Sequence, residues 1–402
     1  MALWENALPK SPALKNLNDG VMRLGLGFKI VMFGSLVIYM TGCREDIYIQ
    51  QSTSTEVGEP RFTGVDGFYL LNEGNMGSNK STLDYFDETT GTYIKNIYAE
   101  RNPSVVKELG DVGNDLEIYG SKLYAVINCS HKVEVMRATD ATRISKIDIP
   151  NCRYAIGHGG YVYVSSYVSP TTDNPKAPCG AVYKVDTLSL SVVGRVEVGY
   201  QPEEMAVSNG KLYVANSGGY RAPNYDRTVS VIDINNFVVV RDIDVAINLH
   251  RVKRDKHGMI YVTSRGDNAE VGSRLFVIDP LIDEVVKEID SPVSDMWIHG
   301  DSAYVYSAAI NELTGKTAIS YSIINLQTHS VVDDAIIKDG TDVNIKMPHG
   351  IAVHPITGDI YITDARNYVS SGRIHCYSPK GVLLWSQKTG EIPAHFAFKF
   401  QN

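Results

Sequence analysis

The chain has 402 residues, of which 44% are hydrophobic and 21% are charged, and its formal net charge is −8. This composition supports a large apolar core and excludes a disordered or collagen-like chain. The acidic balance, with no basic tract, argues against nucleic-acid binding, because phosphate contacts require clustered Lys and Arg side chains.

The first part of the chain, residues 1–42, is predicted to be a targeting region. Arg23 and Lys29 form its basic part, and an apolar stretch over residues 30–40 follows. That stretch is too short and wrongly flanked for a stable membrane span. The region is therefore typical of a secretory signal and not of a transmembrane helix.

The signal ends in Met40-Thr41-Gly42-Cys43, which resembles the lipobox of bacterial lipoproteins. The resemblance implies a lipoprotein signal over residues 22–42, cleavage before Cys43 and lipidation of the Cys43 sulfur. Residues 1–21 carry no targeting pattern, and we interpret them as a spurious upstream extension of the gene. A signal anchor with an incidental cysteine is the alternative.

Residues 43–64 are predicted to be a lipidated tether, because the segment is rich in Ser, Thr and Glu. Its start, Arg44-Glu45-Asp46, resembles the signal that carries Bacteroidetes lipoproteins to the outer face of the outer membrane. The resemblance implies a lipid-anchored protein that faces the cell exterior. Further along, Cys129, Cys152 and Cys179 could come close enough for one disulfide, and a reduced state is the alternative.

From residue 65 onward one pattern recurs seven times. The chain is rich in glycine, with 34 residues, and in tyrosine, with 24, which suits short strands joined by tight turns. Each copy holds an apolar residue followed by Tyr and, after a loop, an alternating segment such as Val229–Asp233. Alternation of period two with β-branched and aromatic residues predicts strands. The seven pairs are Phe68-Tyr69, Leu123-Tyr124, Val162-Tyr163, Leu212-Tyr213, Ile260-Tyr261, Ala303-Tyr304 and Ile360-Tyr361.

Each copy predicts four short antiparallel strands, A to D, which is the unit of a β-propeller blade. The first copy begins directly at strand B, over residues 67–71, and the last segment, residues 393–400, has the pattern of a strand A without a following B. We therefore predict an all-β, seven-bladed β-propeller over residues 65–402, whose C-terminal strand completes the first blade. Such closure removes the exposed edge of an open sheet. A two-sheet sandwich is the alternative.

Two motifs resemble a known group of propellers. Residues 210–216, GKLYVAN, followed by residues 229–233, VSVID, are similar to the YncE-like, surface-layer-type seven-bladed propellers. Residues 67–78, with 109–112 later, are similar to Bacteroidetes lipoproteins of that group. One branch, the BtuG-type lipoproteins, binds cobalamin outside a TonB-dependent transporter. The resemblance therefore implies cobalamin as a candidate ligand and an outer-membrane transporter as a candidate partner.

A binding face is predicted where the D–A and B–C loops open around the central channel. Aligning the copies on the Tyr places polar residues at the start of strand A, where an apolar core would not choose them. The long B–C loops bring tyrosines and arginines to the same face, which suits a large planar ligand or a protein partner. The predicted ligand-binding residues are Asn72, Asp115, Arg153, Tyr154, Tyr167, Glu203, Glu204, Tyr220, Tyr225, Arg251, Asp295, His349, Arg366 and His395.

The sequence contains no HExxH, no GxSxG, no P-loop and no GxGxxG after a strand. We therefore predict a non-enzymatic, monomeric surface lipoprotein without a catalytic residue, a metal site or a required cofactor. Its ligand would be a small molecule or a transporter. The negative net charge would not attract an anionic ligand over long range, so a neutral or zwitterionic ligand is expected.

Two alternatives stay open for the same face. Its acidic and histidine side chains could hold a calcium ion or act as an acid/base pair, as in propeller lactonases and lyases. The residues concerned are Asp115, Glu203, Glu204, Asp295, His349 and His395. The loop face could instead bind only another envelope protein, which would make this chain a scaffold.

Overall fold

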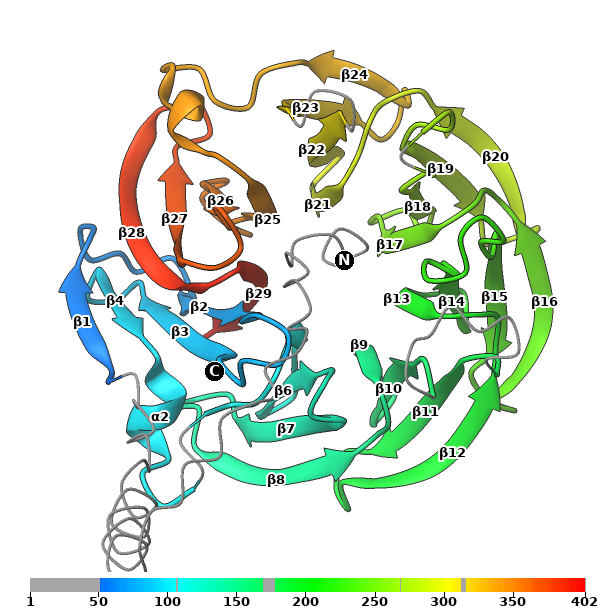
Figure 1. Cartoon of the computed structure of the whole chain (residues 1–402), viewed down its shortest axis with the longest axis horizontal. Helices are drawn as coiled ribbons and strands as arrows, with labels where there is room; N and C mark the ends of the chain where they lie inside the picture. Colours follow the sequence, from blue (N-terminus) through cyan, green and yellow to red (C-terminus); the bar gives the residue numbers. More distant parts are fainter. Residues whose placement is uncertain (1–50, 106–107, 169–177, 268, 312–315, 402) are drawn as a thin grey trace, which may run out of the picture. The chain divides into compact units, whose positions relative to one another are not determined.

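The computed structural model of this chain describes residues 51–105, 108–168, 178–267, 269–311 and 316–401. Within these residues the strands form seven antiparallel sheets around one axis, and each sheet is a blade of a β-propeller (Figure 1). The prediction of an all-β, seven-bladed propeller is confirmed. The predicted signal and the lipidation site at Cys43 lie outside the described residues.

The blades follow one another along the chain. Blade 1 holds β1 (Thr53–Glu56), β2 (Val65–Asn72), β3 (Thr82–Asp87), β4 (Thr92–Lys95) and β29 (Pro393–Phe400). Blade 2 holds β5 (Gly113–Tyr119), β6 (Lys122–Ile127), β7 (Lys132–Arg137) and β8 (Arg143–Asp148). Blade 3 holds β9 (Cys152–His158), β10 (Tyr161–Ser166), β11 (Ala181–Asp186) and β12 (Ser191–Glu197).

The other four blades have the same order. Blade 4 holds β13 (Pro202–Ser208), β14 (Lys211–Asn216), β15 (Thr228–Asp233) and β16 (Val238–Asp244). Blade 5 holds β17 (Leu249–Arg254), β18 (Ile260–Ser264), β19 (Arg274–Asp279) and β20 (Glu284–Ile289). Blade 6 holds β21 (Asp295–His299), β22 (Ser302–Asn311), β23 (Lys316–Asn325) and β24 (Ser330–Asp333). Blade 7 holds β25 (Pro348–Val353), β26 (Ile360–Asp364), β27 (Ser371–Tyr377) and β28 (Leu383–Glu391). Among the residues that the structure describes, two short helices, α2 (Ile97–Arg101) and the 3₁₀ helix η1 (Thr341–Asn344), lie in connections.

The apolar core lies between the blades. Every residue of the second strand from the axis is buried in blades 5 and 7, whereas most residues of the outermost strand β12 are exposed. Among the described residues the buried apolar side chains form seven clusters, one between each pair of neighbouring blades. Each sheet therefore buries both faces against its neighbours, which explains why the inner strands are apolar on both sides.

The repeated tyrosine links one blade to the next. In three copies, Tyr69, Tyr213 and Tyr261, the ring is buried between two blades and the hydroxyl reaches the turn between the third and fourth strands of the next blade. The buried hydroxyls of Tyr124 and Tyr163 have no hydrogen-bond partner among the described residues. The Tyr69 hydroxyl donates to the Ala138 carbonyl at 3.0 Å, and that of Tyr261 donates to the Leu326 carbonyl at 3.0 Å. A buried hydroxyl requires a partner, so these bonds let a large polar ring sit in the core.

The C-terminal strand β29 closes the ring as predicted. It pairs with β2 in antiparallel register, with Tyr69 opposite Ala397 and Phe68 opposite Phe398. The Phe68 ring lies 5.5 Å from the Phe396 ring and 4.7 Å from the Tyr361 ring of blade 7. These contacts join the first and last blades through one aromatic cluster.

Blade 1 carries a fifth strand that the sequence did not lead us to expect. Residues 53–56, assigned above to the tether, form β1 and pair with β4. All four residues of β1 are exposed, so backbone hydrogen bonds and not packing hold the strand in place. The segment TSTE contains no apolar residue, so the sequence lacks the alternation of apolar and polar residues that would have predicted a strand here.

The cysteines and the helices add two findings. Cys129, Cys152, Cys179 and Cys376 are free thiols, so the structure contains the reduced alternative for the first three. Within the described part of the chain, no helix is long and apolar enough to cross a membrane.

Candidate functional site

The candidate site is the central channel and its mouth on the loop face. The innermost strand of each blade starts at this mouth, and the antiparallel strand next to it ends there. In blades 3, 4 and 5 the residue after the second strand donates its N–H to the carbonyl of a residue before the first strand. These bonds run from Tyr167 to Asn151, from Ser217 to Gln201 and from Arg265 to Asn248, at 3.0, 3.1 and 3.0 Å.

The accepting residues have a left-handed backbone conformation that turns the chain into the channel. The φ angles are 46° at Asn151, 53° at Gln201 and 55° at Asn248. Asparagine tolerates this conformation better than most residues. The repeated corner therefore fixes two sets of side chains at the mouth: those that begin the innermost strand and those that follow its neighbour.

Glu203 lies at the centre of the first cluster. Its carboxylate accepts hydrogen bonds from Arg153 at 3.0 and 3.2 Å, from the Tyr167 hydroxyl at 2.6 Å and from Arg265 at 2.6 Å. The Ser217 hydroxyl adds a further bond at 3.2 Å. Burial raises the pKa of Glu203, but the two guanidinium groups outweigh this effect and hold the pKa at about 2. The carboxylate is therefore ionised, and both of its oxygens accept hydrogen bonds from neighbouring side chains.

Tyr167 and Tyr220 form the aromatic edge of this cluster. The Arg153 guanidinium lies 4.8 Å from the centre of the Tyr167 ring. The Tyr220 ring packs edge-on against Tyr167, with centroids 6.4 Å apart, and the Tyr220 N–H donates to Gln201 at 2.8 Å. Tyr167 is buried and Tyr220 is half-buried, so Tyr220 is the member of the pair that meets solvent.

A second cluster joins blades 3, 5 and 6. Arg251 forms a bidentate ion pair with Asp295, with both N···O distances at 2.9 Å. The same guanidinium donates to the Tyr154 hydroxyl at 3.2 Å, and that hydroxyl lies 2.9 Å from His250 Nε2. All of these contacts cross from one blade to another.

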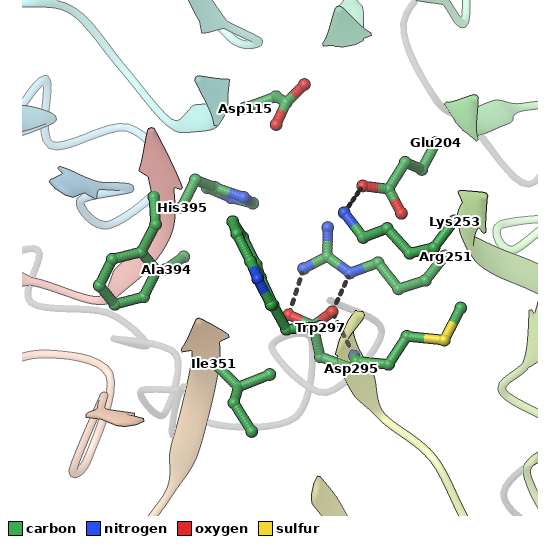
Figure 2. A pocket seen from close by; sticks show the side chains of 11 residues that line it. Asp115, Glu204, Arg251, Lys253, Asp295, Trp297, Ile351, Ala394 and His395 are labelled. Carbon is green, nitrogen blue, oxygen red and sulfur yellow. Dashed lines mark hydrogen bonds and ion pairs between the residues drawn. The ribbon is translucent and has the colours of Figure 1, made fainter. Parts of the chain in front are cut away.

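Below the mouth the channel encloses a small cavity with a water-accessible volume of about 40 Å³, room for about three water molecules. Trp297 and His395 project into the space, and the Asp115 carboxylate also faces it, from the strand next to that of His395 (Figure 2). Lys253 reaches Glu204 at 2.6 Å on another side of the cavity. The lining combines charged side chains with the apolar residues Met296, Trp297, Ile351, Ala394 and Phe396.

Two carboxylates of the cavity accept hydrogen bonds from backbone N–H groups of the next blade along the chain. Asp115 accepts the Ala155 N–H at 2.8 Å, and Glu204 accepts the Val252 N–H at 2.8 Å. Ala155 and Val252 lie at equivalent positions of β9 and β17, the innermost strands of blades 3 and 5. The channel-facing edge of an innermost strand has no neighbouring strand, so its N–H groups need other acceptors. Burial raises the pKa of Asp115 above its usual range. It also raises the pKa of Glu117, two residues further along β5, to about 7.

Glu73 is shared by two histidines at the other side of the mouth. Its Oε1 atom lies 3.1 Å from His349 Nε2 and 3.2 Å from His395 Nε2. Burial raises the pKa of Glu73, but the two imidazoles outweigh it and hold the pKa well below its usual range. The predicted neighbours His349 and His395 are thus brought together, and a carboxylate absent from the predicted set links them.

The structure brings together most of the predicted ligand-binding residues at the mouth and the cavity. Asn72 is an exception, because its buried amide bridges to Thr82 within blade 1. Tyr225 and Arg366 lie on the loops but, among the described residues, their side chains make no hydrogen bond or ion pair with the clusters above. These three residues are not part of the assembled site.

Several residues of the site were missed: Glu73, His250, Lys253, Arg265 and Trp297. Glu73 and Arg265 directly follow the second strand of their blades, at the position that Tyr167 and Ser217 occupy elsewhere. Aligning that position across the repeats, in the same way as the start of the first strand, would have identified them. Lys253 and Trp297 lie two residues further into the innermost strand, where the same face of the strand recurs.

Among the residues that the structure describes, no group of three or more His, Cys, Asp or Glu side chains is arranged to hold a metal ion. Three of the carboxylates proposed as calcium ligands, Glu203, Glu204 and Asp295, pair with an arginine or a lysine instead. The fourth, Asp115, accepts a backbone N–H.

Comparisons with known proteins give a family and a fold. A model of the family described as Domain of unknown function (DUF5074) matches residues 66–398. No curated protein matches the chain. Solved structures of similar fold include the periplasmic gluconolactonase of Pseudomonas aeruginosa, with 13% identity and a TM-score of 0.59 over 83% of this chain and 99% of that one.

Two further structures come from Bacteroides. One is a putative 6-phosphogluconolactonase of Bacteroides fragilis, with 11% identity and a TM-score of 0.58 over 85% of this chain and 99% of that one. The other is a quinonprotein alcohol dehydrogenase-like protein of Bacteroides thetaiotaomicron, with 16% identity and a TM-score of 0.54 over 85% and 80%. At these identities the likeness concerns the fold alone.

Proposed function

The chain belongs to the DUF5074 family of domains of unknown function, and we propose that it is a non-enzymatic binding protein of the cell surface. A lipid on Cys43 would anchor it to the outer membrane with the propeller facing outward. The loop face would capture a small molecule or dock on a transporter. Cobalamin, which the resemblance to BtuG-type lipoproteins implies, is the specific candidate ligand.

The observation that carries this proposal is the pairing of the charged residues at the mouth. Glu203, Asp295 and Glu204 each hold an arginine or a lysine, and Glu73 holds two histidines. General acid/base catalysis requires a group that is free to exchange a proton with the substrate. A set of paired charges supports a rigid, preorganised contact surface instead.

The size of the cavity supports binding on the face and not inside the channel. A space for about three water molecules does not admit a cofactor-sized ligand. Such a ligand, or a partner protein, would rest on the loop face against Tyr220. A tyrosine offers a flat contact area and a hydroxyl group at low entropic cost.

Lactone hydrolysis is the second candidate, and Asp115 is the observation that favours it. Its carboxylate opens on the cavity without a cationic hydrogen-bond partner among the described residues, and burial raises its pKa. A carboxyl group of raised pKa in a cavity is suited to proton transfer. This candidate would also need a divalent ion, as in the calcium alternative raised from the sequence.

The proposal is tested by mixing the purified protein with cobalamin and following cobalamin absorbance through gel filtration. We expect absorbance to co-elute with the protein, and we expect Tyr220→Ala to weaken binding by about tenfold, the loss typical of an aromatic anchor. Tyr183→Ala, a half-buried tyrosine on the outer part of blade 3, is the matched control.

Absence of a protein-bound absorbance would reject cobalamin as the ligand. Hydrolysis of gluconolactone that requires added calcium and is lost in Asp115→Asn would support the second candidate and contradict the non-enzymatic one.

A further inference from the structure

One part of the channel mouth carries more positive than negative charge, although the chain as a whole is acidic. Three guanidinium groups, those of Arg153, Arg251 and Arg265, face two carboxylates, those of Glu203 and Asp295. The five side chains therefore carry one surplus positive charge, in a protein whose formal net charge is −8. Such a local excess acts on a ligand at contact distance, where the distant surface charges are screened.

His250 has a buried ring nitrogen, Nδ1, without a hydrogen-bond partner among the described residues of this positive region. The Tyr154 hydroxyl oxygen accepts from Arg251, so its own proton is free to point at His250 Nε2. A neutral imidazole that accepts at Nε2 carries its proton on Nδ1. Burial lowers the pKa of His250 well below its usual value, and Arg265, Arg251 and Arg153 lower it further, so the ring is neutral. The Nδ1 atom is buried and, among the described residues, has no partner.

Arg265 presents a second unused donor on the same blade. Its Nη2 atom donates to Glu203 at 2.6 Å, but its Nε atom is buried and meets no acceptor in the described part of the chain. His250 and Arg265 lie at the same end of blade 5. Leu249 pairs with Ser264, His250 follows Leu249, and Arg265 follows Ser264. A buried donor without an acceptor is destabilising, so two of them at one end of a blade need an explanation.

We propose that the Nδ1–H of His250 and the Nε–H of Arg265 receive an anionic group of the ligand, a carboxylate or a phosphate. The oxygens of such a group accept both hydrogen bonds, and its charge matches the surplus of the three arginines. Asp267, the nearest acid on the following loop, does not compete, since it accepts the N–H groups of Ala269 and Val271 in its own loop. This inference rests on the proposed binding function of the loop face and names the chemical class of what it binds.

The experiment measures binding of inorganic phosphate and of acetate to the purified protein by thermal shift and calorimetry, at constant ionic strength with chloride as the reference anion. Two variants remove the donors, His250→Phe and Arg265→Gln. Arg366→Gln is the control, because it removes the same charge from an exposed arginine on the same face. The melting temperature and circular dichroism of each variant without ligand establish that it is folded.

We expect a saturable rise in the melting temperature of the wild-type protein and of Arg366→Gln, with binding at least about tenfold weaker in the two donor variants. A response to phosphate alone assigns a phosphate group, and a response to acetate as well assigns a carboxylate. Equal binding by all variants, or no saturable response in the wild type, overturns the inference, and water then serves these donors. Retention of a ligand in gel filtration without phosphate or acetate binding would overturn this inference and leave the proposed function standing.

Discussion

Glu203 shows how a single side chain organises the mouth of the channel. Its carboxylate is only 1% exposed and accepts bonds from four side chains that belong to three blades. A buried charge is tolerated only when it is paired and hydrogen-bonded. Removing such a charge leaves its partners buried and uncompensated, so its loss should be more costly than the loss of any surface ion pair.

We predict that Glu203→Gln lowers the free energy of unfolding by about 3 kcal/mol at neutral pH, since the amide turns an NH₂ group toward two arginines. The measurement is urea denaturation followed by circular dichroism. Glu284→Gln, which breaks an exposed ion pair with Arg241, is the control and should change stability by less than about 1 kcal/mol. Because the pKa of Glu203 is held at about 2, its contribution is present above its unfolded pKa of about 4.5 and is lost as the pH falls toward 2. The gap between wild type and variant should therefore shrink over that range, and a constant gap would contradict the assignment.

Glu117 should have the opposite dependence on pH. Burial raises its pKa to about 7, so the folded protein holds the proton more tightly than the unfolded chain. Its effect on stability therefore becomes unfavourable as the pH rises from about 4.5 through 7. Glu117→Gln keeps an oxygen to accept the Gly157 N–H, which lies 2.9 Å from the carboxylate. We predict that this variant equals the wild type at about pH 4.5 and is more stable at about pH 8; equal denaturation midpoints at both values would refute this.

At the scale of the element, the C-terminal strand closes the ring of blades. β29 forms the innermost strand of blade 1 although it lies at the opposite end of the chain from β2. Of its buried side chains, Phe396 packs in the cluster with blade 7 and Ala397 in the cluster with blade 2. β1, by contrast, adds an exposed strand to the outer edge of the same blade and buries no side chain.

We predict that a chain truncated after Ile392 loses its cooperative thermal transition, because blade 1 would lack its innermost strand and expose the Phe68 cluster. Differential scanning calorimetry measures this. A chain truncated after Phe400, which keeps all of β29, is the control and should melt like the wild type. A transition of wild-type height and temperature in the shorter chain would show that closure is dispensable.

At the scale of the whole molecule, one part of the channel mouth is positively charged, whereas the net charge of the protein is negative. From the net charge we expected a neutral or zwitterionic ligand. The structure gathers three arginines at one point of the ring, while many of the acidic residues lie on outer strands and turns. Composition sums charges over the surface, whereas a bound group responds to those within a few ångströms.

The sequence alone determined the repeat, the strand order of a blade and the closure of the ring. These depend on local patterns, namely alternation of period two and an apolar-Tyr pair, which show in each copy by itself. It also placed the starts of the innermost strands around one channel, because equivalent positions in a ring must face the same axis. The sequence did not predict β1, because all four of its residues are polar and exposed and show no apolar alternation.

Only the tertiary structure decided which charged groups are paired and which donors are left over. Arg153 and Glu203 lie 50 residues apart, Tyr154 and Arg251 lie 97 apart, and Glu73 and His395 lie 322 apart. Each pairing depends on the rotation between blades and on side-chain rotamers, and neither leaves a trace in the order of residues along the chain. The repeat brings these residues to one mouth, but the distances of a few ångströms that make an ion pair or leave an N–H unused arise only when seven blades pack against one another.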